Sequence, residues 1–370
     1  MLDSAESDHR FPCEQCGADL RFSPGGDKLV CDHCGFEKPL ENRASAAPIR
    51  EIALEVGLQN RDAIEFEETR VLSCENCGAQ VEFDENVHAA ECPFCASPVV
   101  TSTGTHRHIK PRGVIPFALC ERDAHGAMTS WLGRLWFAPN GLTKYARKGR
   151  RMEGIYVPFW TFDADTKTHY TGQRGTVYTE TRTVRRGNET RQEVVRKIRW
   201  KAVSGRVARF FDDVLILAAR SLPKTFTDAL QPWDLSALEP YTADYLAGFR
   251  AEGYTITLED GLSEARAVMD AQIARDVRFD IGGDRQQIAT MESAVSDVTF
   301  KHILLPVWVA AYRYRGKSYR FVVNGQTGRV QGERPWSAFK IAIAVIVVAL
   351  IAAAIGYGMA MNEAQFQTSF

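Results

Sequence analysis

The chain has 370 residues, with 45% hydrophobic and 25% charged side chains and a formal net charge of −1. This composition is typical of a folded globular protein and excludes a wholly disordered chain, and the length favours two or three domains. The near-neutral total hides an asymmetry. Residues 1–100 hold 20 acidic and 8 basic side chains, a balance of −12, whereas residues 141–206 hold 16 basic and 6 acidic ones, a balance of +10.

Eight of the nine cysteines form two sets with the same spacing in the N-terminal part of the sequence. Each set has two CxxC pairs separated by 14 residues, and the second set follows the first by 61 positions. The first set is Cys13, Cys16, Cys31 and Cys34, and the second is Cys74, Cys77, Cys92 and Cys95. Neighbouring positions match as well, such as Gly17 with Gly78. The pattern predicts a repeat of two zinc ribbons, at residues 1–45 and 71–105, joined by an acidic linker at 46–70.

Four thiolates satisfy Zn²⁺ completely and leave no coordination position for water or substrate. We therefore expect two structural zinc ions, bound by these eight cysteines, and no catalytic metal. Units of about 25 residues cannot bury enough apolar surface to fold alone, so metal binding would supply their folding free energy. The alternative is a set of redox-active CxxC thiols. It is disfavoured because a redox motif normally begins a helix and would not be duplicated at the spacing of a ribbon.

A 21-residue run without charge, residues 341–361, predicts one transmembrane helix. Such a helix is about 31 Å long, which matches a hydrocarbon core of about 30 Å. Arg329, Arg334 and Lys340 precede the run and Glu363 is the charge that follows it. The positive-inside rule therefore places the preceding residues in the cytoplasm, as the body of a tail-anchored, single-pass protein of the inner membrane.

The cysteine usage agrees with a reducing compartment. The sequence begins MLDSAESDHR, which is acidic and lacks the apolar segment of a secretory signal. Paired thiols in a chain that is not exported are better interpreted as metal ligands than as disulfides. Within the apolar run, Ala352, Gly356 and Ala360 recur at four-residue spacing. Such a stripe of small residues can pair helices, so a homo-oligomer is one alternative for this segment.

Residues 110–335 are long enough for a hydrophobic core and predict a mixed α+β domain. Apolar residues at helical spacing predict a helix over 121–137, and a second helix is expected over 263–278 with Ser263 as its N-cap. The predicted fold class is therefore α+β, with two N-terminal four-cysteine zinc ribbons, this middle domain and one C-terminal transmembrane helix.

Strands are predicted on either side of the second helix. Residues 176–186 and 190–202 alternate around Gly187-Asn188, which is a hairpin signal. Residues 302–330 form strands joined by turns at 315–317 and 324–325.

We find no catalytic constellation in the sequence and expect no enzyme. Residues 316–318 (Gly-Lys-Ser) resemble the end of a phosphate-binding loop, but the required earlier glycine is absent and the surroundings alternate like strands. The Asp212-Asp213 pair is interpreted as turn or surface, and His106 and His108 as linker. An undetected hydrolase in the middle domain is a third alternative, for which no residues can be named.

Several segments, in this order, resemble a bacterial family. The two ribbons are followed by PFWTFDADT at 158–166, LPVWVAAYRYRGKSY at 305–319, VNGQTG at 323–328, GERP at 332–335 and the terminal apolar run. Together they resemble the YdjG-like membrane proteins over nearly the whole chain. The resemblance implies a membrane partner of SPFH-domain and phage-shock-type proteins, and hence recruitment of proteins rather than catalysis.

Members of that family often carry the label primosomal protein N′, or replication factor Y, a superfamily II helicase. A helicase needs an ATP-binding loop and a DExH box, and the sequence contains neither. Two function hypotheses therefore stand. The leading one is a non-catalytic adaptor that docks cytosolic proteins at the membrane.

The alternative is a nucleic-acid-binding protein related to replication restart. Its support is the basic region, where KYARKGRR at 144–151 and VVRKIRWK at 194–201 combine cations with aromatic residues. Nucleic acid is the less favoured partner, because acidic ribbons carrying thiolate-bound zinc would repel phosphates. We expect the basic region to meet an acidic surface, either anionic lipid headgroups or the protein's own ribbons.

Overall fold

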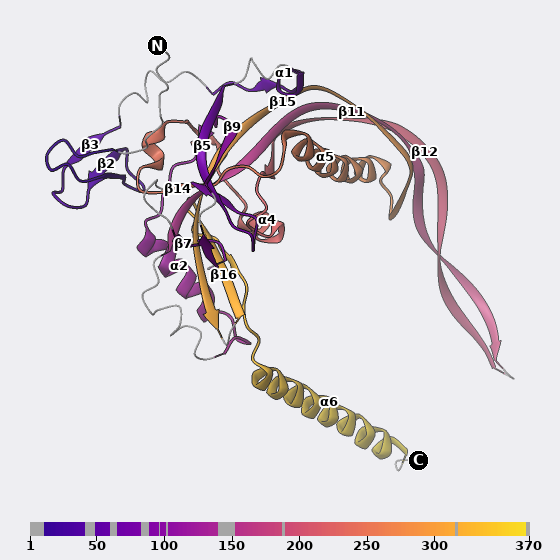
Figure 1. Cartoon of the computed structure of the whole chain (residues 1–370). Helices are drawn as coiled ribbons and strands as arrows, with labels where there is room; N and C mark the ends of the chain where they lie inside the picture. The colour runs from indigo at the N-terminus through magenta and orange to yellow at the C-terminus, as the bar shows by residue number, and fades with distance from the viewer. Residues whose placement is uncertain are drawn as a thin grey trace.

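The computed structural model describes residues 11–40, 49–59, 65–82, 89–95, 97–100, 103–139, 152–186, 189–314 and 317–367. The fold is mixed α+β, as the sequence predicts, with a central sheet, two small cysteine-containing modules and one long C-terminal helix (Figure 1).

Three very long antiparallel strands dominate the central sheet. They are β11 (Glu153–Arg186), β12 (Glu189–Leu217) and β15 (Arg285–Tyr314), with 34, 29 and 30 residues. A mean strand has about 5–6 residues, so each of these is several times longer than usual. β11 lies between the other two, and the three strands curve together into an arch (Figure 1).

The arch loses its third strand towards one end. β15 pairs with β11 as far as Gly175, which lies opposite Arg285, whereas β12 continues to pair with β11 up to Arg186. Residues 176–186 and 189–199 thus form a two-stranded extension, called here the hairpin arm. The predicted hairpin is confirmed by the pairing of Arg186 with Glu189, although both strands extend far beyond the predicted limits. The turn residues 187 and 188 lie outside the described residues.

Helix α5 (Leu258–Ile281) lies in the concave side of the arch (Figure 1). Its buried residues recur at intervals of three or four and face the sheet; they are Leu258, Gly261, Ala265, Met269, Ile273, Val277 and Ile281. They pack in one core region with Trp160 and Phe300 of the sheet. A Cβ on Gly261 would lie only 2.7 Å from Trp160 Cδ1, so the helix backbone lies very close to the sheet at this residue.

The predicted start of this helix was wrong. The helix begins five residues before Ser263, and its N-cap is Thr257, whose hydroxyl accepts a hydrogen bond from the Asp260 N–H at 3.2 Å. Thr257 has an extended backbone, and Glu259 and Asp260 in the first turn favour a helix N-terminus. Ser263 lies inside the helix, after the apolar stripe has started.

Helix α2 (Glu121–Gly133) ends four residues before the predicted limit of 137. Residues 135–138 form a turn instead, in which the Ala138 N–H donates to the Leu135 carbonyl at 3.0 Å. Gly133, the last helical residue, has a low helix propensity, whereas Pro139 disfavours the α-helical region only for Ala138. Ala138 is buried in the same core cluster as Met128 and Leu132 of the helix.

Short elements complete the body. They are β4 (Ile52–Ala53), α1 (Leu54–Gln59), β10 (Gly113–Val114), α4 (Lys224–Leu230), η2 (Leu235–Ala237), β13 (Glu239–Pro240), η3 (Ala243–Leu246), β14 (Arg250–Ala251), β16 (Lys317–Asn324) and β17 (Val330–Gly332). β16 pairs with β15 on one side and with β17 on the other, which confirms the predicted strands after residue 302. The predicted linker contributes to the body, because β4 pairs with β15.

Helix α6 (Ala338–Gln367) follows the body and projects away from it (Figure 1). Its segment Ala338–Gly358 has 21 residues with a mean hydropathy of 2.8, and none of it is buried. By length and composition it can cross a membrane. It begins three residues before the predicted run 341–361.

The packing of α5 can be tested by truncating one side chain on each of its faces. Ile273→Ala should lower the free energy of unfolding by about 2–5 kcal/mol, because Ile273 is 1% exposed and its loss leaves a cavity against the arch. Val268→Ala should change it by less than about 0.5 kcal/mol, because Val268 is 44% exposed. Urea unfolding of the full chain in detergent measures both values, and equal losses would contradict the assigned buried face.

Candidate metal centres

Each set of four cysteines converges on one point, with the four sulfur atoms within 4.8 Å of one another. The nearest pairs have Sγ–Sγ distances of 3.5–3.6 Å, and they are Cys13–Cys34, Cys16–Cys31, Cys74–Cys95 and Cys77–Cys92. All of these cysteines are free thiols. The structure thus brings together the eight predicted ligands in the two predicted groups.

The spacing of the sulfur atoms fits a tetrahedral metal ion. A Zn–S bond of about 2.3 Å in a tetrahedron separates two sulfurs by about 3.8 Å, whereas a disulfide bond is only about 2.05 Å long. The observed distances of 3.5–3.6 Å are close to the first value. Both clusters are therefore suited to hold one metal ion each.

Local backbone geometry explains how each CxxC turn forms. Gly17 has a φ of +74° and Gly78 a φ of +72°, a region that favours glycine. The N–H of Gly17 donates to the Cys13 carbonyl and that of Gly78 to the Cys74 carbonyl, both at 2.8 Å. These turns fold the chain back so that the two thiols of each pair face the same point.

At Cys31, backbone donors favour the thiolate form that a metal requires, whereas burial and neighbouring thiols raise the pKa of Cys16 and Cys34. The N–H groups of Cys34 and His33 point at the Cys31 sulfur and lower the pKa of its thiol to about 6. His33 contributes through its backbone, while its side chain lies outside the group of four sulfur atoms.

The first cysteine module packs on the body around the aromatic ring of Phe22, within a shared core cluster. Its sheet comprises β1 (Leu20–Phe22), β2 (Lys28–Cys31) and β3 (Glu37–Pro39). The Phe22 ring lies 5.4 Å from Tyr245 and 6.4 Å from Phe249, and its N–H donates to the Ala247 carbonyl at 2.9 Å. Cys16 and Cys34 remain exposed. Two of the four thiols of this cluster therefore face the surface, while the other two are buried.

The second module is built into the core. It comprises β5 (Phe66–Ser73), β6 (Gln80–Glu82), β7 (Ala89–Glu91), β8 (Pro98–Val100) and β9 (Thr103–Ile109). Cys92, Phe94 and Cys95 are all buried and share a core cluster with Val157 and Ile303 of the central sheet. The two cysteine clusters thus have matching geometry and different surroundings.

The interpretation of His106 and His108 as linker was wrong. Both lie in β9, which pairs with β5 along its whole length, and His108 is 8% exposed with its ring 4.9 Å from that of Tyr254. Nearby, Glu252 forms a β-bridge with Val81 of the second module. Burial raises the pKa of Glu252 to about 8, and its carboxyl accepts a hydrogen bond from the Ser221 hydroxyl at 2.8 Å.

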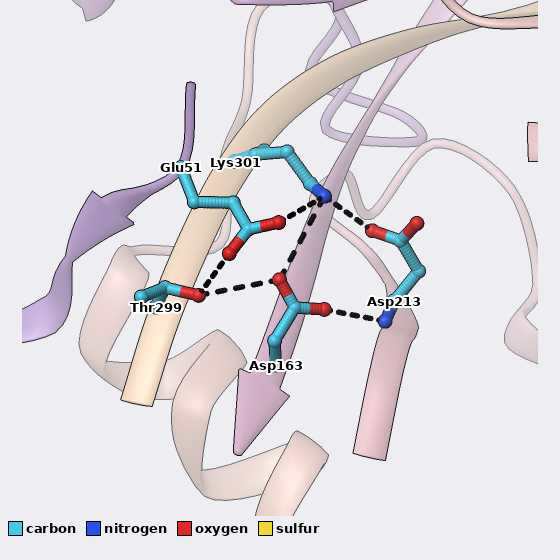
Figure 2. Close-up of polar contacts among 5 residues, drawn as sticks. All are labelled: Glu51, Asp163, Asp213, Thr299 and Lys301. Atoms are coloured by element: carbon cyan, nitrogen blue, oxygen red, sulfur yellow. Dashed lines mark hydrogen bonds and ion pairs between the residues drawn. The ribbon is translucent and has the colours of Figure 1, made fainter. Parts of the chain in front are cut away.

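The structure reveals one polar cluster that sequence reasoning missed (Figure 2). The Lys301 ammonium lies 2.8 Å from Asp213, 3.1 Å from Glu51 and 3.7 Å from Asp163. Thr299 bridges two of these carboxylates, with its hydroxyl 2.7 Å from Glu51 and 3.2 Å from Asp163. Asp163 also accepts the Asp213 N–H at 2.5 Å. Glu51 and Lys301 are 250 positions apart, so no local pattern predicts their contact.

This cluster is an internal ion-pair network. Asp163, Asp212 and Asp213 lie close enough to hold a cation together, but the Lys301 ammonium already provides the positive charge. Burial raises the pKa of Asp163 to about 6, against the opposing effects of the Asp213 N–H and Lys301. Burial alone would lower the pKa of Lys301, yet the surrounding carboxylates hold it above its ordinary value. Asp212 and Asp213 belong to β12 and not to a turn, whereas Asp212 is exposed, as the surface interpretation expects.

The Gly-Lys-Ser segment belongs to a hairpin, as predicted. Tyr314 of β15 lies opposite Lys317 of β16, and residues 315 and 316 lie outside the described residues. The following turn starts at Asn324, whose side-chain oxygen accepts the N–H groups of Gln326 and Thr327 at 2.8 and 2.9 Å.

Comparison with known proteins gives a relative over nearly the full length. The chain is 25% identical over 342 residues to the uncharacterized protein YdjG of Bacillus subtilis strain 168, covering 90% of this chain and 92% of the relative. This similarity supports the YdjG-like resemblance. No family model matches the chain. No solved structure matches it either.

The two clusters should respond differently to loss of an equivalent cysteine. The full chain should contain two zinc ions, and Cys34→Ser and Cys95→Ser should each retain one. Cys95 is 6% exposed, within the core, so its substitution should also lower the melting temperature of the central sheet. Cys34→Ser is the matched control because Cys34 is exposed, and it should leave that transition nearly unchanged.

Elemental analysis of the purified protein gives the zinc content, and thermal melting followed by circular dichroism gives the transition. A wild-type content near one ion or none would contradict the assignment of two zinc sites. Equal melting temperatures for the two variants would contradict the structural role assigned to the second cluster.

Proposed function

We propose that this protein is a membrane-anchored zinc-ribbon adaptor that docks cytosolic proteins at the bacterial inner membrane and performs no chemistry of its own. The observation that carries the proposal is the hairpin arm, which extends beyond the third strand of the arch and exposes side chains on both of its faces. A long exposed surface of this kind, carried by a body that also holds the two cysteine modules, suits the binding of another protein.

In this proposal the metal in both clusters is zinc. Four thiolates are the ligand set of structural zinc sites, and the bound ion would hold each module together without a free coordination position. The first cluster would be held by Cys13, Cys16, Cys31 and Cys34, and the second by Cys74, Cys77, Cys92 and Cys95. The ions would then stabilise the body that carries the arm.

One face of the hairpin arm has the composition of a protein-binding surface. The register places Val177 opposite Ile198 and Thr181 opposite Val194, so these apolar side chains share a face with Arg196. Val194 is 63% exposed and Ile198 is 41% exposed. Apolar side chains combined with arginine are characteristic of the centres of interfaces, so we expect a partner with an acidic and partly apolar surface.

Contact of the arm with the first ribbon of the same chain is disfavoured by their positions. β2 and β3 of the first module lie at one end of the molecule, and the tips of β11 and β12 lie at the opposite end (Figure 1). In this proposal the acidic surface that meets the arm therefore belongs to another molecule. SPFH-domain or phage-shock-type proteins are the partners we propose, and their support is the YdjG-like resemblance.

The proposed topology places α6 across the inner membrane and the body in the cytoplasm. Its support is the apolar length of α6 together with Arg329, Arg334 and Lys340, which precede the apolar run and favour the cytoplasmic side. The eight clustered thiols give a second argument, because they need a reducing compartment to remain free of disulfide bonds.

A nucleic-acid-binding function is the second candidate, and the same arm favours it. Two-stranded β-ribbons enter DNA grooves in several protein families. On the other face of the arm, Lys197 pairs with Glu180 and the Arg199 guanidinium lies 5.1 Å from the Tyr178 ring centroid. The other basic segment, 144–151, lies outside the described residues. DNA binding, measured as an electrophoretic mobility shift, that weakens with salt and requires Arg196 and Arg199 would support this candidate over the adaptor.

The adaptor proposal predicts that the face of the arm with Val194 and Ile198 binds a specific protein. We expect Val194→Glu combined with Ile198→Glu to abolish capture of that protein from native membranes, because the substitutions place charge in an apolar interface. Val184→Glu is the matched control, since Val184 is 36% exposed and opposite Arg191 on the other face of the arm.

Quantitative mass spectrometry of the tagged full chain measures the retained proteins. The proposal requires a protein that is enriched with the wild type and the control and at least about tenfold depleted with the double variant, a ratio that corresponds to about 1.4 kcal/mol. An identical set of proteins for all three chains would contradict it.

A further inference from the structure

We propose that the turn after α2, residues 134–139, inserts Trp136 into the interfacial layer of the bilayer that α6 crosses, and so fixes the orientation of the body on the membrane. This inference rests on the proposed membrane anchoring and adds a lipid-binding surface to it. The occupant of the surface is the headgroup and upper acyl region of the phospholipids.

The first observation is a direct connection between the turn and the start of α6. The Lys340 ammonium donates to the carbonyl oxygens of Trp136 and Ala138 at 3.0 and 2.8 Å. The Ser337 N–H donates to the Phe137 carbonyl at 2.8 Å. Residues about 200 positions apart in the sequence are thereby held together at the point where the apolar helix begins.

The second observation is that the turn is well packed while its tryptophan is not. Backbone hydrogen bonds link Trp136 to Arg134 and Ala138 to Leu135, and Ala138 is 5% exposed in the core cluster that contains α2. Trp136 nevertheless has 80% of its surface exposed. A hydrogen-bonded turn therefore presents one of the largest apolar side chains to the surroundings, and transfer of such a ring out of water is favourable.

The third observation is the level at which the indole lies. Lys340 is the last charged residue before the apolar run, so the edge of the hydrocarbon core falls close to it. The polar layer beyond that edge is about 5–7 Å thick on each side. Because the Trp136 carbonyl is bound by Lys340 itself, its side chain starts within this layer, where tryptophan is enriched in membrane proteins.

Neighbouring side chains extend the same surface. Trp336 is 58% exposed and Phe339 is 76% exposed, and the Arg334 guanidinium lies 4.3 Å from the Trp336 ring centroid. The Phe137 and Trp336 rings lie 6.3 Å apart, which connects the turn to the segment before α6. Aromatic rings combined with cations match both the apolar and the anionic parts of a phospholipid interface.

Quenching of tryptophan fluorescence tests this surface in the full chain reconstituted into phosphatidylcholine vesicles. Lipids brominated near the headgroup end of the acyl chain should quench Trp136 and Trp336. Trp136→Phe should therefore remove about half of the bromolipid-quenched emission, since Trp336 remains at the interface. Trp200→Phe is the matched control, because Trp200 lies opposite Gly175 at the base of the hairpin arm and not in the turn bound to Lys340, and it should remove none.

Quenching by aqueous iodide distinguishes the outcomes that would contradict the proposal. If the emission lost in Trp136→Phe is the part that iodide quenches, the Trp136 indole lies in water and the proposal is wrong. If Trp136 is quenched by neither reagent, a protein surface covers it, which also overturns a lipid contact. Failure of the anchoring itself would look different, because carbonate would then extract the chain from the vesicles and no tryptophan would respond to bromolipid.

Discussion

The continuous antiparallel ladder centred on β11 is the constraint on which the rest of the structure depends. At one end of β11 both neighbours are present and both faces are covered, with Trp160 against α5 on one side and Val157 in the core shared with the second cysteine module on the other. At the opposite end only β12 remains, and side chains on both faces are exposed. The same three strands therefore provide a packed body and a free arm.

The curvature of this ladder has a local cause. The register of β11 shifts against β12 and against β15 around Asp163, and such bulges bend a strand and increase its twist. Asp213, next to this bulge, has a φ of +50°, a region that aspartate tolerates better than most residues. Lys301 offsets part of the negative charge of the carboxylates gathered there. The ion-pair network thus stabilises the bend that gives α5 its concave surface.

Sequence reasoning succeeded where the signal is local. The spacing of the cysteines indicated the two groups of four sulfur atoms, the alternation around Gly187-Asn188 indicated the hairpin, and the apolar run indicated α6. It failed where contacts are distant in sequence, because the length of β11 depends on β15 more than 100 positions later and the burial of Phe94 depends on the central sheet. The start of α5 was misplaced because Ser263 and Thr257 are both acceptable cap residues. The acidic first turn at Glu259 and Asp260 and the close packing of Gly261 on Trp160 favour the earlier start.

These features combine into a body with two four-cysteine clusters suited to bind a metal ion, attached to an apolar helix and carrying a free arm. The most direct test of the proposed docking role is the side of the membrane on which the body lies. Protease added to sealed spheroplasts should leave the body intact and should digest it after lysis, and a reporter active only in the periplasm should be active when fused after Phe370. Digestion of the body in intact spheroplasts would place the cysteine clusters outside the cytoplasm and contradict the docking of cytosolic proteins.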